Sequence, residues 1–268
     1  MILILSAVAQ ENAHLIEQLN QPRRRCCGPV ELHTGLLGEH HVTLATTGIG
    51  KANAAGISAM LLLHLRPALV ILCGCGGAYH SGGLSTGDLA LATAEYYADE
   101  GAITPHGFLG MDALGLAMLE HAGTRYFNSF PTNPRLTDLA AASLGAFALT
   151  AHCKLSTGRF VTVSTCSGTD SRASAVEAAT GGICESMEGA AVAQMCRMFA
   201  TDFIEIRAIS NMVETRDLTR WDLPGAMRRA QEALLYWLHH CPPATLSSCN
   251  PDAPAPPAAP TTPKPQEV

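Results

Sequence analysis

The sequence predicts one large α/β domain, with a largely parallel β-sheet that helices cover on both faces. Strand-like apolar runs alternate with Ala- and Leu-rich segments of helical periodicity, which is typical of parallel strands joined by helices. The run from Ala68 to Cys73 is apolar without interruption, as expected of a strand buried on both faces. The expected strands cover residues 2–7, 42–46, 69–73, 88–92, 160–163 and 203–209. The expected helices cover residues 52–65, 136–147, 171–179, 190–199 and 226–240.

The end of the chain differs in composition from the rest. Of the 268 residues, 47% are hydrophobic, yet nine of the 16 prolines follow His240. About 240 residues are enough for one domain with a sizeable core. We therefore expect a folded domain over residues 1–240 and a disordered Pro/Ala-rich tail over residues 241–268.

Charge and cysteine usage exclude several classes of protein. The net charge of −6 argues against a nucleic-acid partner, which would require a basic face; the run Arg23–Arg25 is expected in a solvated loop. No apolar stretch is long enough to cross a bilayer, and the first eight residues lack the basic start of a signal peptide, so no membrane partner is expected. The ten scattered cysteines suit buried thiols in a reducing cytoplasm, and their spacing predicts no metal site.

Two polar residues stand where their surroundings do not explain them. Glu188 opens a run of small residues that predicts a tightly packed helix, and Asn211 follows the buried strand at 203–209. Open α/β sheets usually bind ligands at such helix starts and strand ends. A structural role is the alternative, with Glu188 at the positive end of a helix and Asn211 capping a turn.

Two glycine clusters each follow an expected strand. Residues 46–51 (Thr-Thr-Gly-Ile-Gly-Lys) form half of a dinucleotide-binding pattern, but Asn53 stands at the third glycine position, which argues against such a site. In residues 73–78 (Cys-Gly-Cys-Gly-Gly-Ala), Gly76 and Gly77 would let the backbone approach a flat ligand. The same glycines could instead form only a tight turn.

Taken in order, these motifs resemble those of the nucleoside phosphorylase and nucleosidase superfamily over residues 1–240. The matching segments are 7–11, 48–51, 74–77 with 87–88, 187–191 and 207–211. The resemblance implies a three-layer α/β/α sandwich of the nucleoside phosphorylase type with a central mixed, mostly parallel sheet. It also implies a small-molecule nucleoside substrate, no metal or organic cofactor, and a homo-oligomer.

Within the superfamily, the chain is most similar to the futalosine hydrolases. The segments that carry this similarity are 99–101, 105–109, 185–188, 210–213 and 220–225. The similarity implies hydrolysis of futalosine to hypoxanthine and dehypoxanthine futalosine. Two alternatives stay open: a nucleosidase acting on methylthioadenosine, S-adenosylhomocysteine or aminofutalosine, and a non-catalytic nucleoside-binding protein on the same fold.

The resemblance assigns roles to individual residues. Glu11 would orient or deprotonate the attacking water, although by itself it could be a helix-start carboxylate. Glu188 would accept hydrogen bonds from the ribose hydroxyls, and Met187 would pack under the sugar. Gly76 and Gly77 would line the substrate site. Phe108, Arg216 and Arg220 are candidates to contact the aromatic carboxylate of the 5′ substituent.

Asn211 discriminates between leaving groups. Adenosine-type nucleosidases carry an aspartate at this position, whereas an amide can donate an N–H to the carbonyl oxygen of a 6-oxopurine. Asn211 therefore favours a hypoxanthine-type base, and it cannot act as a general acid.

The residues before the second glycine cluster favour water over phosphate as the nucleophile. Leu72 and Cys73 precede Gly74, where the phosphorylases of the superfamily place an arginine. A phosphate would have little to pair with there.

Overall fold

A ten-stranded mixed sheet forms the centre of the computed structural model, which describes residues 1–246. Its strands follow the order β11-β6-β12-β13-β5-β1-β4-β3-β2, and β14 pairs with both β5 and β6. The strands of this sheet are β1 (Ile2–Ser6), β2 (Asn20–Cys27), β3 (Val30–Leu37), β4 (His40–Thr46), β5 (Leu69–Ala78), β6 (Leu89–Tyr97), β11 (Ser129–Pro131), β12 (Leu155–Thr162), β13 (Cys184–Ser186) and β14 (Asp202–Met212).

The six predicted strands and five predicted helices are all present. The longer helices are α2 (Lys51–Leu65), α3 (Pro134–Thr150), α4 (Asp170–Thr180), α5 (Gly189–Met198) and α6 (Leu223–His240), and a short α1 covers Ala13–Glu17. The predicted α/β class is confirmed, with parallel ladders between β1 and both of its neighbours, and between β5 and β14.

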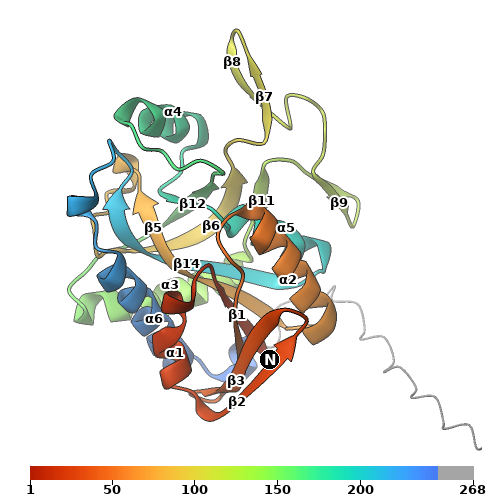
Figure 1. Cartoon of the computed structure of the whole chain (residues 1–268), viewed down its shortest axis with the longest axis vertical. Helices are drawn as coiled ribbons and strands as arrows, with labels where there is room; N and C mark the ends of the chain where they lie inside the picture. Colours follow the sequence, from red (N-terminus) through yellow and green to blue (C-terminus); the bar gives the residue numbers. More distant parts are fainter. Residues whose placement is uncertain (247–268) are drawn as a thin grey trace, which may run out of the picture.

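Alternation along the strands explains how the helices are distributed. In β1, Ile2 and Ile4 face a core shared with α1, α3 and α6, whereas Leu3 and Leu5 face a core shared with α2 and α5. Successive side chains of a strand point to opposite faces, so an uninterrupted apolar strand buries both. Helices therefore cover the sheet on both faces (Figure 1).

Part of the sheet closes on itself, which the sequence did not predict. The pairings run from β5 through β13, β12, β6 and β14 back to β5. The interior of this ring is filled by apolar side chains that include Phe160 and Ile209. The closure brings the carboxyl ends of β5 and β14 beside β13, three segments that are distant in sequence.

The arginine run is not in a loop, contrary to expectation. Arg23–Arg25 lie in β2, an exposed strand at the edge of the sheet that pairs with β3. This strand has no apolar periodicity because nearly all of its residues are exposed. Charge on such an edge discourages pairing with another chain.

Two small hairpins lie outside the main sheet. One consists of β7 (Gly101–Thr104) and β8 (Gly107–Gly110), and the other of β9 (Leu119–His121) and β10 (Thr124–Tyr126). The β7–β8 hairpin projects from the body of the molecule (Figure 1).

The packed chain extends beyond the predicted domain end at residue 240. A short helix, α7 (Pro243–Leu246), follows α6, and Cys241 and Leu246 are buried in the core that contains α6. His40 Nε2 lies 2.7 Å from the carbonyl oxygen of Cys241. The remainder of the predicted tail, residues 247–268, lies outside the described residues.

Within residues 1–246, none of the helices combines the length and the apolar character that a bilayer crossing requires.

Candidate functional site

The polar residues singled out in the sequence meet around one cavity of about 320 Å³ at the carboxyl ends of the strands. Ligands bind at this end of the sheet in open α/β proteins. Residues from β5, β13, β14 and the segments after β1 and β12 contribute to it. The lining residues are Ala7, Val8, Glu11, Ile49, Cys75, Gly76, Gly77, Cys166, Ser167, Glu185, Ser186, Met187, Glu188, Arg207, Ser210, Asn211, Arg216, Trp221, Leu223 and Met227.

Glu11 lines the cavity, and three backbone N–H groups hold its carboxylate in place. Its Oε2 accepts hydrogen bonds from the backbone N–H groups of Ala7 (3.0 Å) and Val8 (3.2 Å), just after β1. Its Oε1 accepts from the N–H of Cys75 at 2.9 Å, in β5. Each carboxylate oxygen can accept two hydrogen bonds, so Oε1 keeps one acceptor position for a ligand or a water.

Gly74 is required for this arrangement. A Cβ atom at Gly74 would overlap Glu11 Oε1 and would lie 2.8 Å from Arg207 Nη1. The second glycine cluster is therefore more than a tight turn, because its first glycine leaves room for two charged side chains.

Glu188 lines the same cavity and lies immediately before α5. Its Oε1 accepts from the N–H of Gly50 at 2.9 Å, and its Oε2 lies 3.5 Å from Arg207 Nη2. Burial raises the pKa of this carboxyl, and the positive charge of Arg207 partly offsets that rise. The first glycine motif, between β4 and α2, thus positions a carboxylate; Gly50 has φ +91°, which suits glycine there.

Arg207 connects Glu188 with the backbone of β5 at Cys75. The sequence analysis did not single it out as a site residue. Its side chain is 2% exposed, and Nη1 donates to the carbonyl of Cys75 at 2.9 Å. Nε donates to Glu205 at 2.7 Å. A buried arginine within an apolar strand requires such partners, because an unpaired buried charge is costly. The only sequence signal for Arg207 was that it belongs to segment 207–211, which resembles a motif of the superfamily.

Asn211 lies inside β14 and not after the strand as expected. The pairing register shifts between Ile209 and Asn211, so Ser210 is an extra residue opposite β5. Such a bulge bends a strand and redirects its side chains, often beside a functional site. The Asn211 Oδ1 atom accepts from Ser210 Oγ, and Nδ2 donates to the Met212 carbonyl. One N–H of Nδ2 remains for a ligand.

Glu185 is a second cavity residue whose chemistry was not anticipated. Its Oε2 accepts from the hydroxyl groups of Tyr79 and Ser167, both at 2.7 Å, and its Oε1 accepts from the N–H of Ser167 at 2.9 Å. β13, which carries Glu185, is three residues long, too short for hydrophobic periodicity to reveal.

Of the three residues predicted to contact the 5′ substituent, only Arg216 lines the cavity. Arg216 lines the cavity, with its guanidinium 4.5 Å from the centre of the Trp221 ring. Arg220 lies outside the lining and forms an ion pair with Glu214. Phe108 lies on β8 in the projecting hairpin and does not line the cavity of its own chain.

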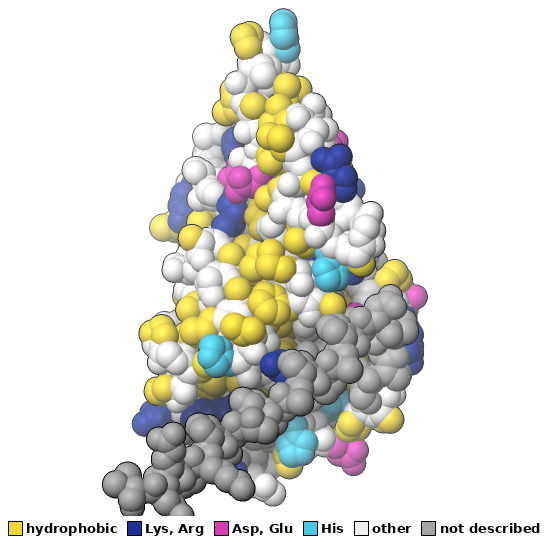
Figure 2. Space-filling model, turned by 90° about the vertical axis from the view of Figure 1, so that its right-hand side faces the viewer, with side chains coloured by type: hydrophobic (Ala, Val, Ile, Leu, Met, Phe, Trp, Pro, Cys, Tyr) yellow, Lys and Arg dark blue, Asp and Glu magenta, His cyan; other side chains and the backbone are white. Residues whose placement is uncertain are grey.

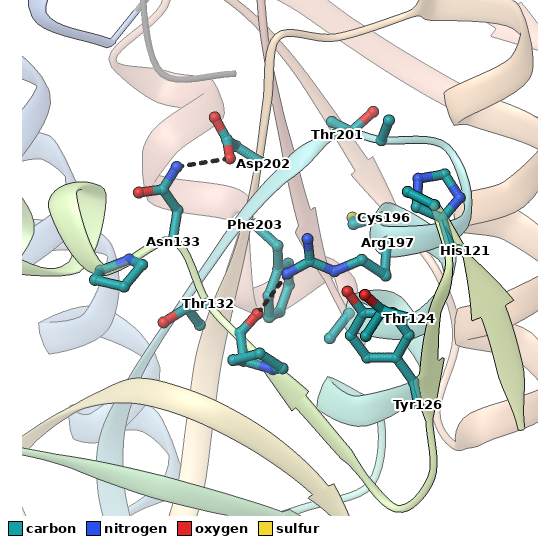
Figure 3. Close-up of a pocket in the computed structure, with 15 residues that line it drawn as sticks. His121, Thr124, Tyr126, Thr132, Asn133, Cys196, Arg197, Thr201, Asp202 and Phe203 are labelled. Atoms are coloured by element: carbon teal, nitrogen blue, oxygen red, sulfur yellow. Dashed lines mark hydrogen bonds between the residues drawn. The ribbon is translucent and has the colours of Figure 1, made fainter. Parts of the chain in front are cut away.

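A larger cavity, of about 500 Å³, lies at the other end of β14 (Figure 3). Its two charged lining residues are already engaged, because Arg197 donates to the Pro131 carbonyl and Asp202 accepts from Asn133. It contains none of the predicted site residues, so the smaller cavity is the candidate site.

The fold and the cavity together define an α/β protein with a polar ligand site at the carboxyl ends of its strands. The sequence pattern of the Phosphorylase superfamily matches residues 1–239, and the chain belongs to this superfamily. The chain is 36% identical over 204 residues to futalosine hydrolase of Thermus thermophilus, covering 75% of this chain and 84% of the relative. It is 31% identical over 234 residues to futalosine hydrolase of Acidothermus cellulolyticus, covering 86% and 87%.

Other similar proteins are named for a different substrate. A 5′-methylthioadenosine/S-adenosylhomocysteine nucleosidase of Hydrogenovibrio crunogenus is 27% identical over 244 residues, covering 89% of this chain and 98% of the relative. The solved structure of S-adenosylhomocysteine nucleosidase from Streptococcus pyogenes superposes with a TM-score of 0.76 at 24% identity, over 90% of this chain and 97% of that chain. This likeness confirms the predicted nucleoside phosphorylase fold.

Proposed function

We propose that this chain is a nucleoside hydrolase that cleaves futalosine with water, releasing hypoxanthine and dehypoxanthine futalosine in an alternative route to menaquinone. The observation that carries the proposal is the meeting of Glu11, Glu188 and Asn211 in one cavity. The identities of 36% and 31% to two futalosine hydrolases support the substrate.

The two carboxylates suit the two needs of N-glycosidic cleavage. The transition state resembles an oxocarbenium ion and needs a nearby negative charge and a positioned nucleophile. Glu188 supplies an acceptor for the ribose hydroxyls. Glu11, fixed by three N–H groups, holds a water at the free acceptor position of Oε1. We assign Met187 to the underside of the sugar.

The part of the cavity lined by Asn211 and Glu185 suits a 6-oxopurine. Such a base presents a carbonyl oxygen at position 6 and an N–H at position 1, whereas adenine presents an amino group and a bare ring nitrogen. The remaining N–H of Asn211 can donate to the carbonyl, and the Glu185 carboxylate can accept from the ring N–H. Gly76 and Gly77 also line this cavity, and we assign their backbone to contact with the base. A Cβ atom at either position would meet protein atoms, Cys184 Sγ at 2.6 Å for Gly76 and Val213 Cγ2 at 2.8 Å for Gly77, so the glycines also allow close packing of the strands.

The cationic groups of the cavity favour water over phosphate as the nucleophile. Arg207 is engaged by Glu205, the Cys75 carbonyl and Glu188, so it has little left for a phosphate. Arg216 stacks on Trp221 near the cavity rim, where it can pair with the carboxylate of the 5′ substituent.

We assign a homo-oligomeric state and a cytoplasmic location to this enzyme. Figure 2 shows a band of hydrophobic side chains on one face of the molecule. Two exposed apolar residues are Leu63 in α2 and Met198 in α5. Such a band often marks an interface. Phe108, on its projecting hairpin, would then contact substrate in a partner's cavity. A monomer by light scattering would remove this assignment. The buried thiols of Cys73, Cys184 and Cys196 suit a reducing compartment, which cell fractionation would test.

The decisive experiment is a phosphate-free assay of the purified protein with futalosine, aminofutalosine, inosine and methylthioadenosine, following the released base. Hypoxanthine from futalosine is the expected product. The Glu11→Gln variant should bind futalosine but lose activity by a factor on the order of 10² to 10⁴, the usual contribution of a general base. Full activity in this variant would remove the role given to Glu11.

Other outcomes identify the competing functions. Adenine released from methylthioadenosine at a higher kcat/KM than hypoxanthine from futalosine would mean an adenosine-type nucleosidase. Cleavage only after phosphate is added would mean a phosphorylase. Binding without release of any base would mean a nucleoside-binding protein on this fold.

A further inference from the structure

Behind the cavity, two glutamates are buried side by side with a single arginine. Glu95 in β6 and Glu205 in β14 are both fully buried, and the Arg207 Nε donates to Glu205 Oε1 at 2.7 Å. A Cβ atom on Gly189 would overlap Glu95 Oε2 and also Glu205 Oε2, so both carboxyl groups reach the same point. Two ionised carboxylates at such close range in a dry interior would repel each other strongly.

The carboxyl groups of Glu95 and Glu205 each have one oxygen without a hydrogen-bond partner. Five buried side-chain polar atoms in the described part of the chain have no partner, and two of them are Glu95 Oε1 and Glu205 Oε2. The Thr162 hydroxyl donates to Glu95 Oε2 and accepts from the N–H of Ala190, so it contributes nothing to these two atoms. A proton on Glu95, donated to Glu205, would give both carboxyl groups a partner.

We infer that Glu95 is a positioning residue that stays a neutral acid in the folded protein and donates a hydrogen bond to Glu205. Glu205 keeps its charge and holds the Nε side of Arg207. The two Nη atoms of Arg207 then hold the Cys75 carbonyl and Glu188 in their places around the cavity. With Glu95 neutral, Arg207 has one charged carboxylate to balance behind the cavity instead of two.

The groups around Glu95 favour its neutral form. Burial raises the pKa of Glu95 well above its usual value, the negative charge of Glu205 adds to the rise, and Thr162 and Arg207 oppose it. From β13, the Cys184 thiol also faces this region, and burial raises its pKa, so it adds no charge. Glu188, at the start of α5, lies beyond Arg207.

The first test measures stability and needs no substrate. A carboxyl that keeps its proton when folded and loses it when unfolded makes the protein less stable as pH rises above the usual carboxyl pKa. Above about pH 5.5, the unfolding constant of the wild type should rise about tenfold more per pH unit than that of Glu95→Gln. Glu39→Gln, which changes an exposed carboxyl, is the matched control and should keep the wild-type slope. Equal slopes for the wild type and Glu95→Gln would overturn the inference.

The second test measures kinetics and rests on the proposed function. Glu95→Gln can still donate to Glu205 and should keep kcat/KM for futalosine within about threefold of the wild type. Glu95→Met is similar in volume but cannot donate, and should lower kcat/KM at least about tenfold. An equal loss in both folded variants would overturn the inference. Should Glu95→Met fail to fold, the pH dependence of the unfolding constant of Glu95→Gln still decides the inference. A wild type that cleaves no nucleoside would refute the proposed function and leave the inference about Glu95 to the stability test.

Discussion

At the scale of single residues, Glu188 shows how burial and hydrogen bonding set the chemistry of the site. The carboxyl loses most of its contact with water, which raises its pKa, and the N–H of Gly50 and the charge of Arg207 favour its ionised form. The ionised form accepts hydrogen bonds at both oxygens, whereas protonation turns one oxygen into a donor and removes the negative charge. The balance between burial and these partners therefore controls activity at low pH.

The pH dependence of activity should reflect this balance. As pH falls through the raised pKa of Glu188, the carboxylate takes up a proton and kcat/KM for futalosine should fall, with a midpoint above 4.5, the usual value for this group. A pH profile checks it. The Glu188→Gln variant should lose activity on the order of 10²-fold and should lack this acid limb. An unchanged limb in the variant would assign the titration to another group.

A single change at Asn211 should alter the choice of base. Asn211→Asp replaces the N–H donor by a carboxyl that suits the amino group and N7 of adenine. The ratio of kcat/KM for futalosine to that for aminofutalosine should fall at least about tenfold, because an unmatched buried polar edge is costly. Release of each base by both proteins measures the ratio. An unchanged ratio would contradict the role given to Asn211.

At the scale of elements, the ends of β5 and β14 determine the shape of the site. The glycines at the end of β5 leave room for Glu11 and Arg207, and the bulge in β14 places Ser210 and Asn211 along the same cavity. The bulge breaks the alternation of an ideal strand in β14, and the glycines near the end of β5 have no side chains. Both features occur at the cavity.

Gly74 provides the sharpest test at this scale. Gly74→Ala should lower kcat/KM on the order of 10²-fold, because the added methyl group displaces Glu11 and Arg207 from their positions. The matched control is Gly145→Ala in α3, where a Cβ meets nothing within 4 Å. The control should keep full activity and gain about 0.5 to 1 kcal/mol in unfolding free energy. Wild-type activity in Gly74→Ala would contradict the argument.

At the scale of the whole molecule, the end of the folded domain is defined by packing and not by composition. Leu246 and Cys241 contribute to the core beside α6, although they follow the point where proline becomes frequent. A chain cut after His240 should therefore lose about 2 to 4 kcal/mol in unfolding free energy relative to one cut after Leu246. Denaturant unfolding of the two truncated chains measures the difference. Equal stabilities would place the domain end at His240, as the sequence predicts.

The sequence by itself determined the class of fold and its main elements. All six predicted strands and five predicted helices appear, because uninterrupted apolar runs indicate buried strands and long segments rich in Ala and Leu favour helices. It also placed Glu188 at a helix start, whereas Asn211 lies inside β14 and not after the strand as predicted. Strands β2, β3, β11 and β13 of the main sheet were missed. β11 and β13 have three residues each, and β2 is exposed along most of its length, which leaves little periodic signal.

Only the tertiary structure decided which of these residues share a cavity and which support it. The closure of β5, β13, β12, β6 and β14 into a ring brings Glu185 and Arg207 to the cavity and buries Glu95 against Glu205. It also separates Phe108 and Arg220 from that cavity. The physical reason is that periodicity records which face of an element is buried, whereas contacts between distant elements depend on strand order and register, which local sequence does not encode.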